Sequence, residues 1–267
     1  MDLGIGGAAA VVTGGTGGMG RATAECLAAD GARVAVFGRT PERLEETAER
    51  LRRLGSPDPI GLRVDVRRRE QVDAAFAGLG ERWGELNILV NTVGPDQVGR
   101  IEELSDEDWV AAFDVGTLSA VRCVRAALPW LRKAEWARIV NVSAHSTRRQ
   151  TPHLVAYTAA KSAMTSLSKN LAKALAKDAI LVNTISPRTF LSDSVRGYLE
   201  SIASTRGVDP TNPVDAMRVI AEDFGSPCDL GRAGLPAEIG AVIAFLASKR
   251  NSYMTGADVN VDGGSDF

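Results

Sequence analysis

The feature that most constrains the fold of this chain is a glycine-rich turn between a short apolar run and an alanine-rich stretch. Ala8 to Thr13 has the unbroken apolar character of a strand that is buried on both faces of a parallel sheet. The turn from Thr13 to Gly20 follows, and the alanines of Arg21 to Ala29 indicate a helix. Strand, glycine turn and helix stand in the order that a dinucleotide-binding site needs.

The glycines of this turn have a chemical reason. Residues without a Cβ let the backbone approach a pyrophosphate, and N–H groups at the helix N-terminus hold its negative charge. The alternative is a flexible loop, since the chain contains 27 glycines. Because the turn has its strand and its helix, we expect it to bind the phosphates of a dinucleotide. The residues expected to do so are Gly14, Thr16, Gly18, Met19 and Gly20.

Apolar runs and helical patterns continue to alternate along the chain. Strands are predicted at residues 34–37, 61–66, 86–90, 138–143, 180–185 and 258–261, and helices at residues 41–54, 69–83, 107–131, 157–176 and 236–248. This alternation predicts an α/β fold, with a doubly wound, mostly parallel sheet of the Rossmann type and helices on both faces. No linker marks a second domain, so we expect one domain over residues 1–267.

Residues 192–230 break the alternation and form an insertion. Two short amphipathic segments, Val195 to Ala203 and Val214 to Phe224, flank a turn at Gly207 to Pro210. Such an insertion can serve as a lid over a bound substrate. The alternative is that these segments only cover the core.

The end of the second predicted strand bears on which dinucleotide binds. An acid about 20 residues after the glycine turn would bind the ribose hydroxyls of NAD, whereas an arginine there can contact the 2′-phosphate of NADP. The chain has no acid at this place and carries Arg39 followed by Thr40. Arg39 could also be a solvated surface arginine. The position favours NADP(H) over NAD(H), with Arg39 and Thr40 as cofactor contacts.

Charge and cysteine content exclude several classes of function. Lys and Arg number 31 against 33 Asp and Glu, a net charge of -2, which makes nucleic acid an improbable partner. Three cysteines and two histidines show no metal-ligand spacing, so we expect no metal and a reducing, cytoplasmic location. No apolar run of about 18 residues occurs, so neither a membrane span nor a leader peptide is expected.

Tyr157 and Lys161 stand four residues apart in an alanine-rich stretch that follows the fifth predicted strand. That spacing puts the phenol and the ammonium on one face of a helix. Taken alone the pair is weak evidence, because tyrosine and lysine commonly pair on helix surfaces without any function. The place of the pair after the fifth strand gives it meaning.

Taken together, these motifs resemble the short-chain dehydrogenase/reductase family, and the resemblance spans nearly the whole chain. The similar elements are the Thr-Gly-x-x-x-Gly-x-Gly turn at residues 13–20, Asp65-Val66, Leu89-Val90-Asn91, Tyr157-x-x-x-Lys161, Val182-Asn183 leading to Pro187, Gly231-Arg232-Ala233-Gly234, Phe245-Leu246-Ala247-Ser248, Thr255-Gly256 and Val261-Asp262-Gly263-Gly264.

The resemblance implies a mechanism and further contacts. Tyr157 would exchange a proton with the oxygen of a ketone or secondary alcohol, while Lys161 would lower the phenol pKa from its usual value near 10 and hold the nicotinamide ribose. By family position, Asp65 and Val66 would flank the adenine. Further cofactor contacts implied in this way are Asn91, Gly94, Pro187, Phe190 and Ser192. The apolar helices around residues 121–131 and 167–175 resemble the family's subunit contacts, which implies a homo-oligomer, a dimer or a homotetramer. The alternative is that these helices pack against the chain's own sheet.

Two of the departures from the family bear directly on catalysis. Ala144 stands thirteen residues before Tyr157, where the family usually has a serine that binds the substrate oxygen, and Gly116 replaces a common asparagine. Residues that could replace the missing hydroxyl are Ser143, His145 and Ser146. Arg188, together with Arg148 and Arg149, could suit a carboxylate or phosphopantetheine-type substrate, although solvated loop arginines are the simpler reading of the latter two.

These features predict an NADP(H)-preferring oxidoreductase that interconverts a ketone and a secondary alcohol, with Tyr157 as general acid/base and Lys161 as its activator. Its partner would be a small carbonyl or alcohol substrate. Two alternatives stay open. One is reduction of an enoyl-type C=C bond, where the missing hydroxyl matters less. The other is a protein that binds NADP(H) with little or no catalysis, which Ala144 and Gly116 would favour.

Overall fold

The computed structural model of the protein describes residues 2–225 and 227–265. In this part of the chain seven parallel strands form one sheet in the order β3-β2-β1-β4-β5-β6-β7. The strands are β1 (Ala9–Thr13), β2 (Arg33–Gly38), β3 (Ile60–Arg63), β4 (Ile88–Asn91), β5 (Ala137–Val142), β6 (Ile180–Pro187) and β7 (Asp258–Val261). The order reverses between β1 and β4, which is where doubly wound sheets bind their ligands. The predicted α/β fold is confirmed.

Helices connect the strands as the alternation predicted. They are α1 (Gly18–Ala29), α2 (Pro41–Leu54), α3 (Arg69–Trp83), α4 (Asp106–Phe113), α5 (Ser119–Leu131), α6 (Val155–Leu175), α7 (Asp193–Arg206), α8 (Pro213–Phe224) and α9 (Pro236–Leu246). The single helix predicted over residues 107–131 is α4 and α5 joined by a π-helical turn, η1 (Asp114–Leu118). In the described ranges no helix has both the length and the apolar character needed to cross a membrane.

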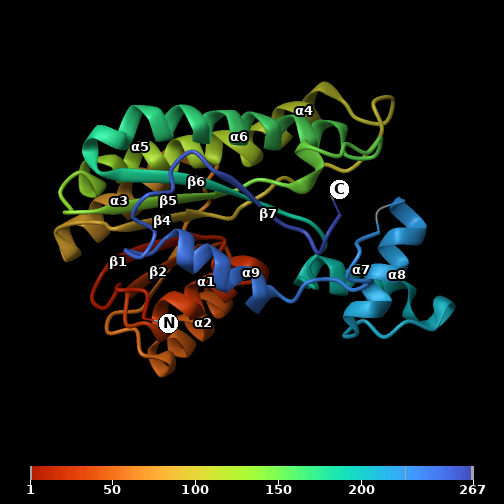
Figure 1. Ribbon diagram of the computed structural model, residues 1–267, viewed down its shortest axis with the longest axis horizontal. Helices are drawn as coiled ribbons and strands as arrows, with labels where there is room; N and C mark the ends of the chain where they lie inside the picture. Colours follow the sequence, from red (N-terminus) through yellow and green to blue (C-terminus); the bar gives the residue numbers. More distant parts are fainter. Residues whose placement is uncertain (1, 226, 266–267) are drawn as a thin grey trace.

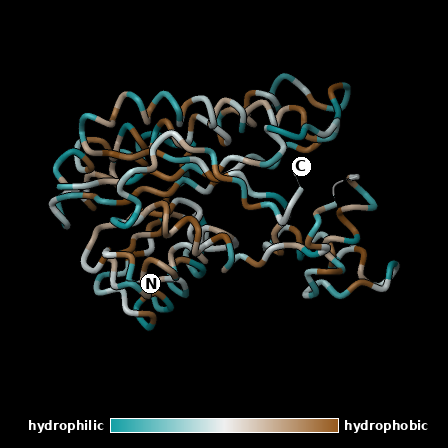
Figure 2. Tube along the Cα trace, viewed as in Figure 1, coloured by the Kyte–Doolittle hydropathy of each residue, from teal (hydrophilic) through white to brown (hydrophobic). Residues whose placement is uncertain are grey.

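The helices lie in two layers, with α1, α2 and α9 on one face of the sheet and α3 to α6 on the other (Figure 1). Alternate residues of each strand enter opposite layers. Val12 and Val36 pack in the layer of α1 and α9, whereas Val11 and Phe37 pack in that of α3 and α5. Figure 2 shows hydrophobic segments along the central strands. Both faces of the sheet are therefore buried, as in other parallel sheets.

Helices α7 and α8 lie at one end of the molecule, beyond the sheet (Figure 1). They share an apolar cluster that includes Leu199, Met217 and Val219 and is separate from the two sheet clusters. Ser192 caps the N-terminus of α7 by accepting a hydrogen bond from the Val195 N–H. The insertion predicted at about residues 192–230 is thus a helical pair with packing of its own.

Strand β3 ends earlier than predicted. The sequence indicates a strand to Val66, but β3 stops at Arg63. Asp65 accepts a hydrogen bond from the Arg67 N–H at 3.0 Å, and its carbonyl oxygen accepts from the Arg68 N–H at 2.9 Å. These contacts bend the chain into a turn, which brings Asp65 and Val66 to the edge of the cleft described below.

The close crossing of α1 and α9 depends on Gly240. A Cβ at this position would lie 2.8 Å from the backbone carbon of Ala22. We expect Gly240→Ala to lower the free energy of unfolding by about 1–3 kcal/mol, because neither backbone can move aside without disturbing the packing of its own helix. Chemical denaturation measures this change.

Gly78→Ala is the matched control. Gly78 also lies inside a helix, α3, but a Cβ there would meet nothing within 4 Å. Alanine should be neutral or stabilise by up to about 1 kcal/mol through helix propensity. Equal effects of the two substitutions would show that the α1–α9 contact is looser than described.

Candidate active site

A cleft of about 560 Å³ opens at the carboxyl ends of β1 and β4. It lies where the strand order reverses, between the glycine turn and the start of α7. Most of the residues expected to bind the cofactor line it. They are Gly14, Thr16, Gly18, Met19, Gly20, Arg39, Thr40, Asp65, Val66, Gly94 and Ser192.

The glycine turn fits a pyrophosphate. A Cβ on Gly20 would lie 2.4 Å from the Gly14 carbonyl oxygen and 2.7 Å from Thr92 Oγ1, so this position has room for glycine alone. Thr92 Oγ1 in turn donates to the Thr13 carbonyl oxygen at 2.6 Å, which ties β4 to the turn. Gly17 caps α1 without a side-chain hydrogen bond. The first N–H groups of α1 therefore face the cleft and can bind an anion.

The far end of the cleft is rich in arginine. Arg39, Arg43 and Arg67 line it, and a second cavity of about 480 Å³ beside it adds Arg63 and Arg68. Two acids lie beside these arginines. Asp193 is 3.8 Å from Arg43, and a hydrogen bond from the Arg67 guanidinium to Asp65 is the main cause that lowers the pKa of the Asp65 carboxyl to about 2. The region has the charge expected of an anion-binding surface.

Five expected cofactor contacts lie away from the cleft lining: Tyr157 and Lys161, described below, and Asn91, Phe190 and Pro187. Asn91 is buried at the end of β4, where its Nδ2 donates to Asn141 Oδ1 at 2.8 Å. Phe190 is buried in the sheet core and pairs with Gly234 through an isolated β-bridge. Pro187 ends β6.

Lys161 is buried on α6 and points toward the end of β5. Its Nζ donates to the Val142 carbonyl oxygen at 2.7 Å, and burial lowers the pKa of the ammonium to about 8. A Cβ on Gly94 would lie 3.4 Å from the same Nζ, which places the ammonium against a residue of the cleft wall.

Tyr157 lies one helical turn before Lys161 on α6. Burial, and then the negative charge of Asp96, raise the pKa of the phenol to about 12. This shift is opposite to the lowering expected from Lys161. At neutral pH the phenol is therefore in its protonated form and ready to donate a proton.

The neighbouring hydroxyls already hold α6 in place. Ser143 Oγ donates to the Lys161 carbonyl oxygen at 3.0 Å and lies 2.8 Å from Thr165 Oγ1. Ser146 Oγ accepts a hydrogen bond from Thr158 Oγ1 at 2.9 Å. Ser143 thus gives its hydroxyl proton to the helix, whereas Ser146 only accepts from the helix and keeps its own O–H as a donor.

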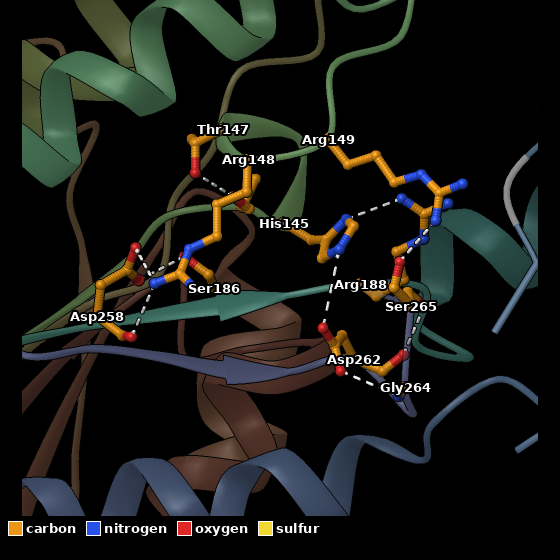
Figure 3. A network of polar contacts seen from close by, with 11 residues as sticks. His145, Thr147, Arg148, Arg149, Ser186, Arg188, Asp258, Asp262, Gly264 and Ser265 are labelled. Atoms are coloured by element: carbon orange, nitrogen blue, oxygen red, sulfur yellow. Dashed lines mark hydrogen bonds and ion pairs between the residues drawn. The ribbon is translucent and has the colours of Figure 1, made fainter. Parts of the chain in front are cut away.

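Ala144 brings only a methyl group to the end of β5, in extended backbone with φ -158° and ψ 147°. His145, the third residue named as a substitute, is part of a different network, shown in Figure 3. Arg188 Nη1 donates to His145 Nδ1 at 2.9 Å, and His145 Nε2 lies 3.8 Å from Asp262 Oδ2.

Figure 3 also accounts for the loop arginines. Arg148 Nη2 lies 3.3 Å from Asp258 Oδ2 on β7, and Arg149 Nη1 donates to the Ser265 carbonyl oxygen at 2.9 Å. Together with Arg188 they attach the segment before α6 to the C-terminal part of the sheet. Their role here is to join segments that are far apart in the chain.

Gly116 lies in the π-helical turn and faces α6. A Cβ there would lie 2.8 Å from Ala160 Cβ and 3.3 Å from Pro95 Cγ. Thr117 Oγ1 closes the contact by donating to the Ala160 carbonyl oxygen at 2.7 Å. The family's asparagine has no space at this position without a shift of α6.

Sequence reasoning missed Asp96 and Gln97, which also line the cleft. The sequence contained a signal for them. Both residues come shortly after Gly94, just beyond the carboxyl end of a central strand, where ligands of parallel sheets bind.

Comparison with known proteins agrees with this geometry. The family model described as enoyl-(acyl carrier protein) reductase matches residues 14–266. The chain is 30% identical to the 3-oxoacyl-acyl-carrier-protein reductase FabG of Chlamydia muridarum over 257 residues, which cover 96% of each protein.

Two solved structures are similar along nearly the whole chain. One is the L-sorbose reductase of Gluconobacter frateurii in complex with NADPH and L-sorbose, with a TM-score of 0.92, 30% identity and coverage of 99% of this chain and 98% of that one. The other is a short-chain oxidoreductase of Pseudomonas aeruginosa with an atypical catalytic centre, with a TM-score of 0.87, 33% identity and coverage of 96% of both chains. The chain belongs to the short-chain dehydrogenase/reductase family of nicotinamide-dependent oxidoreductases.

Proposed function

We propose that this protein is an NADP(H)-dependent reductase that converts a ketone to a secondary alcohol. The observation that carries the proposal is the pair on α6: the buried Lys161 ammonium lies against Gly94 of the cofactor cleft, and the half-buried Tyr157 precedes it by one turn. A proton donor beside a dinucleotide cleft is the arrangement that carbonyl reduction requires.

Each residue has a separate task in this mechanism. When bound, the nicotinamide supplies the hydride for the carbonyl carbon. Tyr157, which is protonated at neutral pH, donates its proton to the carbonyl oxygen. Lys161 is mostly charged at pH 7, since its pKa is about 8, and its ammonium holds ribose hydroxyls of the cofactor while Val142 fixes its position. A raised phenol pKa suits the reductive direction.

The charge of the cleft supports the choice of NADP(H). Arg39 lines the cleft with an exposed guanidinium and has no ion pair within the described residues. Arg43 also lines it and lies 3.8 Å from Asp193 at the start of α7. Either guanidinium can make charge-assisted contacts with a 2′-phosphate.

The missing serine hydroxyl favours a second candidate, reduction of an enoyl C=C bond. Loss of one donor to a developing oxyanion costs about 10²–10³ in rate. Ala144 supplies no such donor, and the Ser143 hydroxyl already donates to the Lys161 carbonyl oxygen on α6. Turnover of enoyl thioesters without turnover of ketones would favour this candidate.

We also propose that the protein acts in the cytoplasm as a homo-oligomer, a dimer or a tetramer. Val110 on α4 is 70% exposed and Leu118 on η1 is 45% exposed, on the outer helical layer. Large apolar side chains in this position suit a contact between subunits. Light scattering of the purified protein tests the assembly.

The proton donor is tested by Tyr157→Phe. Removal of the phenol hydroxyl should lower kcat for NADPH-dependent ketone reduction by about 10²–10⁴, because the carbonyl oxygen loses its proton source. Binding of NADPH, followed by its fluorescence, should stay unchanged. Tyr253→Phe is the control, since that side chain is 99% exposed. Full activity of Tyr157→Phe would refute the mechanism.

The pH dependence of reduction follows from the two pKa values. Tyr157 stays protonated up to about pH 12, so the phenol imposes no decline in the neutral range. Lys161 loses its charge as the pH rises through about 8, so kcat/KM for reduction should be level from pH 6 to 7.5 and fall above 8. In Lys161→Arg, which stays charged, that decline should be absent. A decline that persists in this variant would assign it to another group.

Cofactor preference is tested by Arg39→Ala. Loss of a hydrogen bond to a charged phosphate should raise KM for NADPH by about 10–100-fold and change KM for NADH less than about threefold. Arg53→Ala, an exposed arginine on α2 outside the cleft lining, is the control. Equal changes for NADPH and NADH would argue against a 2′-phosphate contact.

A further inference from the structure

The segment after β4 is fixed beside the approach to Tyr157. The Gly99 N–H donates to the His153 carbonyl oxygen at 2.8 Å, and Gly99 and Leu154 form an isolated parallel bridge. Pro95, at the other end of the segment, is buried against the π-helical turn at Gly116. Asp96 and Gln97 are thus held between two anchored points.

Asp96 brings a carboxylate to this position. It lines the cleft, and its charge is near enough to the Tyr157 phenol to raise the pKa of that group. An ionised carboxylate accepts hydrogen bonds and donates none. A ligand group that meets Asp96 beside the proposed proton donor must therefore carry an O–H or N–H.

Gln97 supplies a second polar group. Its Oε1 is buried, and no group in the described residues donates to it. Gln97 lines the same cleft as Asp96, so a bound molecule can reach it. A buried amide without a partner is unfavourable. A substrate hydroxyl can donate to the amide oxygen or accept from the amide N–H, because a hydroxyl is both a donor and an acceptor.

The charges around this place disfavour an acidic substrate. The arginines that sequence reasoning considered for a carboxylate have other partners: Arg148 contacts Asp258, Arg149 donates to Ser265 and Arg188 donates to His145. Asp96 would repel a substrate carboxylate that lay near Tyr157. A neutral substrate with hydroxyl groups meets neither obstacle.

We propose that Asp96 and Gln97 form a hydroxyl-binding subsite beside Tyr157, and that the substrate is a neutral polyhydroxylated ketone. Asp96 accepts a charge-assisted hydrogen bond from a hydroxyl near the carbonyl carbon, and Gln97 pairs with a further hydroxyl. This inference rests on the proposed ketone reduction and names the substrate class of the same site.

Three ketones with four carbons test the subsite. Erythrulose is neutral and carries three hydroxyls, butan-2-one has the same skeleton without them, and acetoacetate carries a carboxylate. With saturating NADPH we expect kcat/KM for erythrulose to exceed that for butan-2-one by about 100-fold. This ratio corresponds to one or two charge-assisted hydrogen bonds. Acetoacetate should be the poorest substrate.

Asp96→Asn separates binding of hydroxyls from chemistry. It should raise KM for erythrulose by about 10–100-fold with a smaller change in kcat. Any effect through the Tyr157 phenol is common to both ketones, so the ratio of kcat/KM for erythrulose to that for butan-2-one should fall by about 10–100-fold. Gln97→Leu should act in the same direction. Glu102→Gln, an exposed acid further along the same connection, is the control and should leave both substrates unchanged. Unaltered melting temperature and NADPH binding show that the variants are folded.

The outcomes distinguish the two proposals. If butan-2-one or acetoacetate is reduced as well as erythrulose, or if Asp96→Asn affects erythrulose and butan-2-one equally, the subsite is refuted while ketone reduction stands. If none of the three ketones is reduced, the proposal of ketone reduction is wrong. Calorimetric titration of the NADPH-loaded protein with erythrulose then tests whether the subsite exists. Binding of erythrulose that Asp96→Asn removes would support it, and absence of binding would overturn it.

Discussion

The hydrogen bond from the buried Lys161 ammonium to the Val142 carbonyl oxygen joins the helix that carries Tyr157 to the end of a central strand. A charge removed from water needs a partner, and here the partner belongs to the sheet. Ser143 reinforces the contact by donating to the Lys161 carbonyl oxygen. The proposed proton donor therefore takes its position from the most rigid part of the molecule, and the surrounding loops adapt to it.

Close packing around α6 gives a physical reason for one departure from the family. The π-helical turn brings Gly116 against Ala160 and Pro95, so the absence of a side chain is what lets the helices approach. The same approach orients the segment after Pro95, which carries Asp96. A single helix contact thus accounts for the glycine at position 116 and fixes the start of the segment that carries Asp96.

Two groups of arginines have different roles in this structure. Those around the glycine turn, such as Arg39, line the cofactor cleft. Those near the active helix, such as Arg148 and Arg149, attach the C-terminal strand and the segment that follows it. The cleft is accordingly basic where a phosphate would bind and carries a carboxylate where a substrate would bind. Net charge, which is close to zero, conceals this separation.

Sequence periodicity alone determined the α/β fold, since short apolar runs and helical stretches alternate with regular spacing. Local chemistry also predicted that the glycine turn binds phosphates, and in the structure this turn lines the cleft. The end of β3 could not be predicted in this way, because Asp65 bends the chain through hydrogen bonds to Arg67 and Arg68.

What only the tertiary structure decided was the use of individual polar side chains. Ser143, His145 and Ser146 were all candidates to replace the missing hydroxyl. Only the folded contacts show that Ser143 donates to the Lys161 carbonyl oxygen and that Ser146 accepts from Thr158. The phenol pKa likewise depends on burial and on Asp96, a residue 61 positions away in the chain. Sequence spacing determines which residues share a helix or a strand, but burial and charge come from elements that meet only in the folded molecule.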